Sequence, residues 1–122
     1  MVFVLCACDK KLVIDFFIDN QSNDTVFVSG TCIKHNYDNP NTNEINVKIL
    51  PQEKAIFYKW ETIQAFGFSR ENIKHYLNSI VIYNQEKTLK YNPLDSLYRW
   101  TVTIISDDYQ QTVLTIYPED FE

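Results

Sequence analysis

The sequence predicts an all-β protein, an antiparallel two-layer β-sandwich of immunoglobulin-like type with one short helical insertion. Short apolar runs alternate with polar residues at a period of two from Leu12 onward, which is typical of strands with one buried face. Asn, Asp, Ser and Pro residues interrupt these runs at short intervals, as turns do. About seven such strands within 122 residues fit one domain with a single core.

The first two strands are predicted on either side of a polar turn. Over 14–19, three apolar residues face one way while Asp15 and Asp19 face the other. Asn, Ser and Asp residues favour a turn at 20–24, and residues 26–33 resume the apolar pattern. We therefore expect these two strands to form a hairpin.

The middle of the chain adds two strands and a long loop. Residues 35–44 are rich in Asn and Asp around Pro40 and predict an exposed loop. Strands are expected at 47–49 and 56–60, and a Pro-x-Glu turn separates them. Aromatic residues in the second of these strands suit a pleated surface.

The period changes once, at 70–78, where apolar residues recur at helical spacing after a Ser N-cap and predict a short helix. Strands are expected again at 80–83 and 112–117. The most regular alternation lies between them, and its apolar members are Tyr98, Trp100, Val102 and Ile104. Trp100 is expected in the core between the two layers because it lies within this alternation.

The first eleven residues form an apolar stretch that ends abruptly in charge. Within it, Leu5-Cys6-Ala7-Cys8 resembles the bacterial lipobox, which places a small residue before the cysteine that is lipidated. Cleavage before Cys8 and acylation of this residue would hold the protein on a membrane surface. We expect residues 1–11 to be the signal end and tether, and residues 12–122 to be the β-sandwich domain.

Two other interpretations of the cysteines remain open. Residues 2–8 suit a first β-strand because Val, Phe and Leu favour sheets. Alternatively, Cys6, Cys8, Cys32 and His35 supply the thiolate and imidazole ligands that zinc prefers, although their spacing differs from that of a standard finger. If the N-terminus is processed, Cys32 is expected to be a small buried hydrophobic residue.

Four segments carry loose motifs: an extended run that ends in an Asn/Ser/Asp-Thr turn at 16–26, a Pro-x-Glu turn within 49–53, an apolar run at 80–84 and a late Trp strand at 98–102. Together they resemble the small uncharacterised lipoproteins abundant in Bacteroidetes-type bacteria. The resemblance covers most of 12–117 and implies a secreted, lipid-anchored β-sandwich at the bacterial cell envelope, periplasmic or on the cell surface. It implies no particular activity and no catalytic residues.

Two triplets match the Asp-Ser/Thr-apolar pattern at which bacteria of that type attach O-glycans. They are Asp24-Thr25-Val26 and Asp95-Ser96-Leu97. In an exported protein, Thr25 and Ser96 are therefore candidates for O-glycosylation, since a glycan belongs on an exposed turn. The alternative is that both are ordinary turn residues.

Charge and composition exclude several kinds of function. Eleven Lys and Arg against sixteen Asp and Glu give a net charge of −5, which argues against a nucleic-acid partner. No apolar run approaches the roughly 18 residues of a membrane-spanning helix. Two Gly residues leave no glycine-rich phosphate loop, and neither a metal nor another cofactor is expected.

Candidate catalytic residues are few. The chain has two His and no nucleophile-elbow motif, so nucleophilic catalysis is not indicated. Asp107 and Asp108, or Asp15 and Asp19, are formally available as paired carboxylates for glycoside hydrolysis. The alternative function is therefore a small envelope hydrolase with an acidic carboxylate site.

Aromatic residues are the compositional surplus, with eight Tyr, eight Phe and two Trp. A Tyr ring buries area against a sugar or an apolar partner while its hydroxyl stays hydrogen-bonded. We expect a non-enzymatic module that binds a protein or glycan partner through the 35–44 loop, because binding residues tend to lie on loops held by a rigid scaffold. Tyr37 is placed at the centre of this surface, with Tyr91 and Tyr109 as neighbours.

Overall fold

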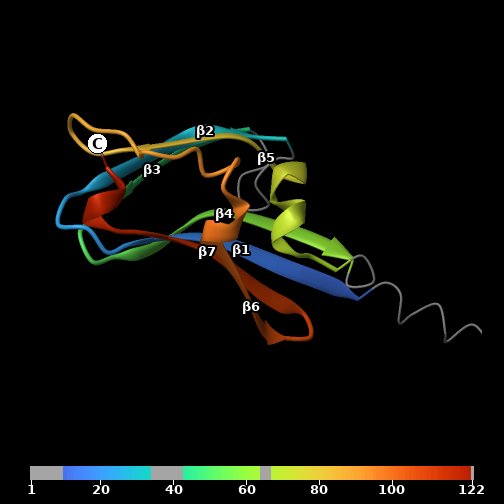
Figure 1. The fold of residues 1–122 in the computed structure, drawn as a ribbon. Coiled ribbons are helices and arrows are strands. Elements are labelled where there is room, and N and C mark those ends of the chain that lie inside the picture. Colours follow the sequence, from blue (N-terminus) through green and yellow to red (C-terminus); the bar gives the residue numbers. More distant parts are fainter. Residues whose placement is uncertain (1–9, 34–42, 64–66, 122) are drawn as a thin grey trace, which may run out of the picture.

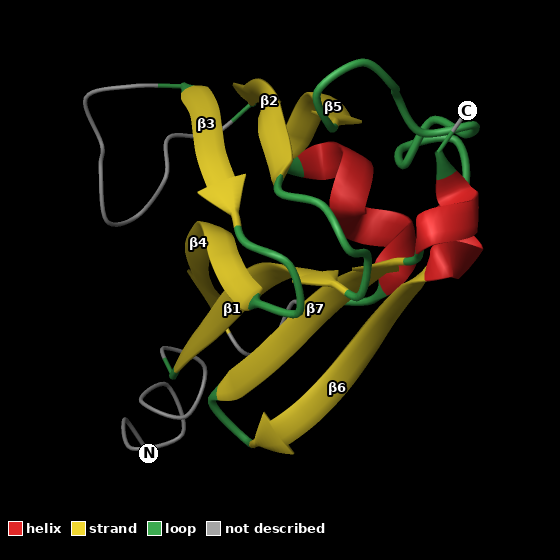
Figure 2. Cartoon of the chain, turned by 90° about the vertical axis from the view of Figure 1, so that its left-hand side faces the viewer, coloured by secondary structure: helices red, strands yellow, loops and turns green. Residues whose placement is uncertain are grey.

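The computed structural model describes residues 10–33, 43–63 and 67–121, and it consists of two facing β-sheets with a shared core (Figure 1). The predicted all-β sandwich is confirmed. The strands are β1 (Lys11–Asn20), β2 (Val26–Cys32), β3 (Glu44–Ile49), β4 (Lys54–Ile63), β5 (Leu77–Tyr83), β6 (Trp100–Ser106) and β7 (Tyr109–Ile116). Three short 3-10 helices, η3 (Arg70–His75), η4 (Leu97–Arg99) and η5 (Pro118–Asp120), lie along one side of the molecule (Figure 2).

The larger sheet has four strands in the order β4-β1-β7-β6. Strands β1 and β7 are parallel, whereas β4 and β6 pair antiparallel with their neighbours. The expectation of a wholly antiparallel sandwich is therefore wrong for this pair. A period-two pattern shows which side chains share a face but carries no information on strand direction, so two strands far apart in sequence can pair either way.

The smaller sheet has the order β3-β2-β5, so β1 and β2 lie in different layers and the predicted hairpin is wrong. The turn between them is polar, but it is tied into the interior rather than closing a hairpin. Asn20 is fully buried, and its Nδ2 donates hydrogen bonds to the carbonyls of Asp24 at 2.9 Å and Leu50 at 3.1 Å. Its Oδ1 accepts a bond from the Ser22 hydroxyl at 2.6 Å. These bonds satisfy the amide while the chain crosses from one sheet to the other.

Trp100 lies in the core as predicted, with 1% of its surface exposed. Its indole nitrogen donates a hydrogen bond of 2.9 Å to the carbonyl of Pro93, and its ring packs edge-on against Phe16. The two ends of the predicted alternation do not follow Trp100 into the core. Tyr98 belongs to η4 and is 70% exposed, and Ile104 is 71% exposed although it is on the same face of β6 as Trp100. The distal end of β6 extends away from the smaller sheet (Figure 1), so nothing described there covers Ile104.

The predicted helix over 70–78 is shorter and of another type. Strand β5 already begins at Leu77, which is 1% exposed and pairs with Cys32 of β2. Packing of this side chain into the sheet ends the helical segment after a 3-10 helix, whose own buried side chain is Ile73. No helix among the described residues is long and apolar enough to cross a membrane.

Strand β1 begins at Lys11, the last residue of the predicted tether, whose ammonium lies 3.0 Å from the Glu61 carboxylate of β4. The predicted lipidation residue Cys8, the alternative strand at 2–8 and the loop residue Tyr37 lie outside the described residues.

Candidate functional site

The structure separates Tyr91 from Tyr109, two of the three tyrosines that the sequence grouped into one binding surface. Tyr91 lies in the connection after β5, and the guanidinium carbon of Arg99 is 3.9 Å from the centre of its ring, just before β6 begins. Tyr109 begins β7 and pairs with Ser106 at the other end of β6. A seven-residue strand spans about 20 Å, so these two tyrosines do not form one cluster. They belong to two different groups of side chains.

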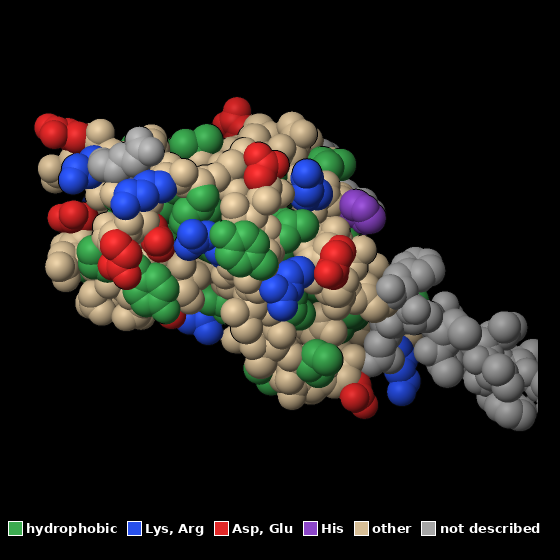
Figure 3. Space-filling view, in the orientation of Figure 1, with side chains coloured by type: hydrophobic (Ala, Val, Ile, Leu, Met, Phe, Trp, Pro, Cys, Tyr) green, Lys and Arg blue, Asp and Glu red, His purple; other side chains and the backbone are tan. Residues whose placement is uncertain are grey.

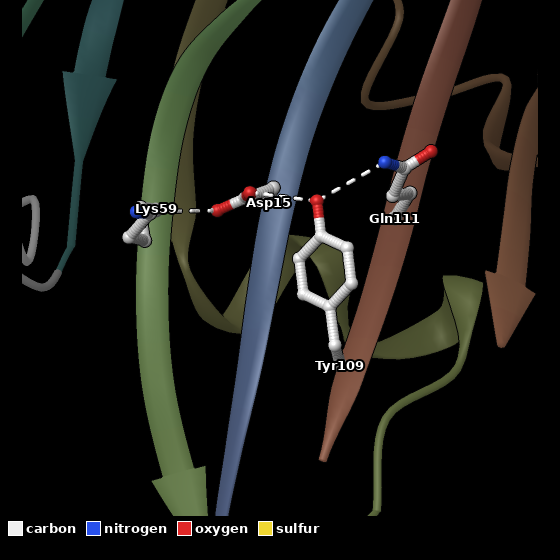
Figure 4. Close-up of polar contacts among 4 residues, drawn as sticks. All are labelled: Asp15, Lys59, Tyr109 and Gln111. Carbon is white, nitrogen blue, oxygen red and sulfur yellow. Dashed lines mark hydrogen bonds and ion pairs between the residues drawn. The ribbon is translucent and has the colours of Figure 1, made fainter. Parts of the chain in front are cut away.

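The first group is a cross-strand row on the outer face of the larger sheet. Asp15 of β1 pairs with Lys59 of β4 on one side and with Gln111 of β7 on the other. Figure 4 shows the Asp15 carboxylate between Lys59 and Tyr109, and we call these four residues the outer polar row. The Tyr109 hydroxyl donates a 2.8 Å hydrogen bond to Asp15 and accepts a 3.0 Å bond from the Gln111 amide, while the Lys59 ammonium lies 4.0 Å from the carboxylate.

The outer polar row pairs most of its polar groups internally, but the Asp15 Oδ1 atom is buried without a hydrogen bond from any described residue and has only the Lys59 ammonium at 4.0 Å. Asp15 is only 9% exposed, and its charge is balanced by Lys59 and hydrogen-bonded by Tyr109. Burial raises the pKa of the Tyr109 hydroxyl; the Gln111 bond opposes this shift, whereas the Asp15 carboxylate adds to it. The phenol therefore remains a neutral donor to Asp15, and this row stabilises the sheet face.

The carboxylates proposed for hydrolysis do not come together as a pair. Asp15 and Asp19 share one face of β1, but four residues of strand separate their Cα atoms by about 13 Å, which exceeds the 5 to 9.5 Å that glycoside hydrolases place between their carboxyl groups. Asp107 and Asp108 are exposed at the β6–β7 turn, where Asp108 accepts a 2.7 Å bond from the Ser106 hydroxyl. No observation on these residues favours acid–base catalysis.

The second group surrounds η4 and consists of Arg70, Tyr98 and Arg99, with the ring of Tyr91 beneath them. We call it the arginine–tyrosine surface. Arg99 is held from three sides: its guanidinium lies over the Tyr91 ring, 5.6 Å from the Tyr98 ring centre and 3.6 Å from the Asp120 carboxylate. Across the middle of the face in Figure 3, Lys and Arg side chains flank exposed hydrophobic ones.

Arg70 completes this surface from η3. Its guanidinium donates a 3.2 Å hydrogen bond to the backbone carbonyl of Tyr98, so both arginines contact the same residue from different elements. The Tyr98 ring itself remains 70% exposed. An exposed aromatic ring with one arginine beside it and a second on its backbone carbonyl brings together residue types that are enriched at protein interfaces.

Tyr91 is the support for Arg99 rather than an exposed contact residue. Its hydroxyl is buried and has no well-oriented hydrogen-bond partner among the described residues. Burial raises its pKa to about 12; the nearby Asp120 carboxylate adds to this shift, whereas the Arg99 charge opposes it. The neutral ring thus presents its face to the guanidinium, an arrangement typically worth about 0.5 to 2 kcal/mol.

Two hollows accompany these groups. One, of about 350 Å³, lies between β5 and the segment 88–93 and is lined in part by Tyr91. The other, of about 300 Å³, lies between the turn at 22–24 and the turn at 84–87. Of the two candidate O-glycosylation residues, Thr25 follows the second hollow in sequence and Ser96 precedes η4, and both are half-buried.

Sequence reasoning missed the arginine–tyrosine surface. It treated Tyr98 as the first member of a strand alternation and Arg99 as an ordinary polar neighbour. Only the order Tyr98-Arg99 after a turn was visible, whereas the partners Tyr91 and Asp120 lie 8 and 21 residues from Arg99. Contacts over such separations depend on the tertiary fold and leave no local signal.

The described residues contain no group of three or more His, Cys, Asp or Glu that could hold a metal ion. Of the residues in the alternative zinc site, only Cys32 is described; it is buried, and its thiol lies 3.2 Å from the Asn43 carbonyl as a hydrogen-bond donor. Comparisons of the chain with protein-family models, with curated proteins and with solved structures find no match. Fold and site together define a two-sheet all-β protein with an exposed arginine–tyrosine surface.

Proposed function

We propose that this chain is a non-enzymatic binding module of the bacterial cell envelope, anchored by a lipid on Cys8, that engages a protein or glycan partner. The observation that carries the proposal is the arginine–tyrosine surface, where the Tyr98 ring is 70% exposed beside the Arg99 guanidinium and Arg70 holds the Tyr98 backbone carbonyl. Tyr and Arg are enriched among the residues that carry most of the binding energy of protein interfaces. A rigid ring also stacks on the apolar face of a sugar.

The order of this surface lowers the cost of binding. Arg99 is fixed by the Tyr91 ring and the Asp120 carboxylate, and Arg70 by the Tyr98 carbonyl. Immobilising a long side chain on binding typically costs about 0.5 to 1.5 kcal/mol. Side chains that are already held before binding reduce this cost.

The charge of the surface favours an acidic partner. Guanidinium groups match carboxylates and sulfates in two-pronged hydrogen bonds. Arg70 contacts the backbone carbonyl of Tyr98, and Arg99 lies beside its ring. Although the chain as a whole carries −5, the two arginines form a local positive patch that orients a negatively charged partner during encounter. A carboxylated glycan and an acidic protein segment both fit this chemistry.

A direct test is a glycan array and an envelope pull-down with the full chain, comparing Tyr98→Ala with Tyr83→Ala. Tyr83 is the matched control because it is also exposed but lies on β5 of the smaller sheet. Tyr98→Ala should weaken binding at least tenfold, about 1.4 kcal/mol, and Tyr83→Ala should leave the affinity unchanged. Equal effects of both substitutions, or none, would refute the placement of the site.

The envelope anchor rests on the resemblance of Leu5-Cys6-Ala7-Cys8 to a lipobox. Because β1 begins at Lys11, an acyl chain on Cys8 would hold the domain within about 10 Å of the anchor. Cys8→Ala should move the protein from the membrane to the soluble fraction and abolish incorporation of labelled fatty acid. Cys6→Ala is the matched control and should keep the label, whereas unchanged membrane association of Cys8→Ala would contradict the anchor.

O-glycosylation of Thr25 and Ser96 remains a proposal that depends on export. Both residues lie at turns, and their side chains are half-buried. An attached glycan would therefore have to project into solvent from the exposed part of each turn. Mass spectrometry of the protein from its native envelope, with Thr25→Val and Ser96→Ala as controls, tests each position separately.

A further inference from the structure

The four edge strands of the two sheets differ in how they resist pairing with another chain. Exposed edges invite further strands, and proteins usually block them with charges, bulges or covering segments. Strand β3 carries Glu44 and Lys48, and β5 is partly covered by the bridge between Tyr83 and Thr88. Strand β4 carries three charged residues, Lys54, Lys59 and Glu61. Its pairing with β1 also contains an irregularity.

Strand β6 has no charged residue that would oppose pairing with another strand. Its sequence, Trp100 to Ser106, contains no charged residue, no Pro and no Gly, and its only irregularity lies at the end, between Ile104 and Ser106. It pairs with β7 alone, and no described segment runs along its other side (Figure 2). Two large apolar side chains are left in solvent there, Ile104 at 71% and Ile105 at 55% exposure.

We propose that the open edge of β6 pairs with β6 of a second copy of this chain, antiparallel, so that the two four-stranded sheets become one continuous sheet. The charges at the two ends of β6 favour a second copy of the chain as the partner and antiparallel as the direction of pairing. Arg99 precedes β6, and Asp107 and Asp108 follow it. Antiparallel pairing of identical strands brings the Arg99 end of one copy toward the Asp107–Asp108 end of the other.

Parallel pairing would instead place like charges side by side, which destabilises strand pairs. Between its ends the strand is neutral, so nothing in it opposes self-pairing. An antiparallel pair centred on Thr103 also places Val102 of each copy opposite Ile104 of the other. The exposed apolar surface of Ile104 is thereby covered, and the unpaired backbone groups of the edge gain partners.

This interface shares Arg99 with the arginine–tyrosine surface but needs neither Tyr98 nor Arg70, so it goes beyond the binding function proposed above. Oligomeric state and partner binding are separate readouts. A substitution at the centre of β6 should change the first and leave the second intact.

The test is sedimentation equilibrium of the full chain over a dilution series, comparing wild type, Thr103→Lys and Asn46→Lys. Thr103 is exposed on β6, and a lysine there brings two ammonium groups together across the pair. We expect a wild-type dimer whose dissociation constant rises at least tenfold in Thr103→Lys. Asn46 is exposed on β3, the edge of the smaller sheet, so the same lysine there should leave the dimer unchanged.

The proposal is overturned if the wild-type chain is monomeric at every concentration, or if Thr103→Lys dimerises as tightly as wild type. An unchanged melting temperature verifies that Thr103→Lys is folded; if it is not, Thr101→Lys on the same edge replaces it. A monomer that binds vesicles of phosphatidylethanolamine and phosphatidylglycerol, and loses that binding with Ile104→Lys, would instead assign the isoleucines to a lipid surface and reject the dimer.

Discussion

Tyr109 and Tyr98 lie near opposite ends of β6 and use the same side chain in different ways. The Tyr109 hydroxyl is bonded to Asp15 and Gln111, so its polar group is already engaged within the outer polar row. The Tyr98 ring is 70% exposed, and what is ordered around it is the two arginines. A tyrosine whose hydroxyl is bonded internally stabilises the fold, whereas an exposed ring beside a held arginine is available to a partner.

The two groups also differ in how their charges are balanced. Asp15 is nearly buried and depends on Lys59 and Tyr109, so loss of either partner leaves a charge poorly solvated. Arg99 is about one-third exposed, so its charge keeps part of its hydration without Asp120. The first group therefore responds to substitution through stability, and the second through binding.

The largest expected loss of stability comes from Trp100, the core residue that directly follows Arg99 of the arginine–tyrosine surface. Trp100→Ala should cost about 3 to 5 kcal/mol of unfolding free energy, because it leaves a cavity beside Phe16 and frees the Pro93 carbonyl. Urea unfolding measures this change. A loss below about 1 kcal/mol would contradict the burial of Trp100 and the register of β6.

Trp100 and its neighbours show what the sequence could and could not predict. Alternation placed Trp100 in the core, because one buried face is a local pattern. The same pattern misplaced Tyr98 and Ile104, since it contains no information on where η4 ends or how far the smaller sheet reaches. The parallel pairing of β1 with β7 and the contact of Arg99 with Tyr91 depend on residues distant in the chain, and neither leaves a local signal.

The next effect concerns the outer polar row. Tyr109→Phe should lower the unfolding free energy by about 1 to 2 kcal/mol, because it removes a hydrogen bond to a nearly buried carboxylate. Tyr98→Phe, measured by the same urea titration, is the control and should change stability by less than about 0.5 kcal/mol. Equal losses in both variants would erase the distinction between the two tyrosines.

A smaller effect concerns how Tyr91, beneath the arginine–tyrosine surface, changes the stability of the fold at high pH. Its pKa is raised from 10.0 to about 12 in the folded protein, so between these values the unfolded chain has lost the proton and the folded chain retains it. The stability that this proton contributes is complete below pH 10 and is lost as the pH rises toward 12.

Tyr91→Phe should therefore flatten the decline of stability in this alkaline range, although other buried tyrosines will keep some slope. Urea unfolding at successive pH values gives the comparison, and absorbance of the phenolate near neutral and alkaline pH reports the ionisation itself. An unchanged slope in Tyr91→Phe would show that this hydroxyl is not protected by the fold.

The most direct measurement of the central claim is the affinity of the identified partner or glycan for wild type, Tyr98→Ala and Tyr109→Phe, each paired with its melting temperature. The claim predicts that Tyr98→Ala loses at least tenfold in affinity, about 1.4 kcal/mol, at an unchanged melting temperature. Tyr109→Phe should melt earlier and bind as tightly as wild type. The reverse result, a stable Tyr109→Phe that no longer binds beside a Tyr98→Ala that still does, would move the binding surface to the outer face of the larger sheet.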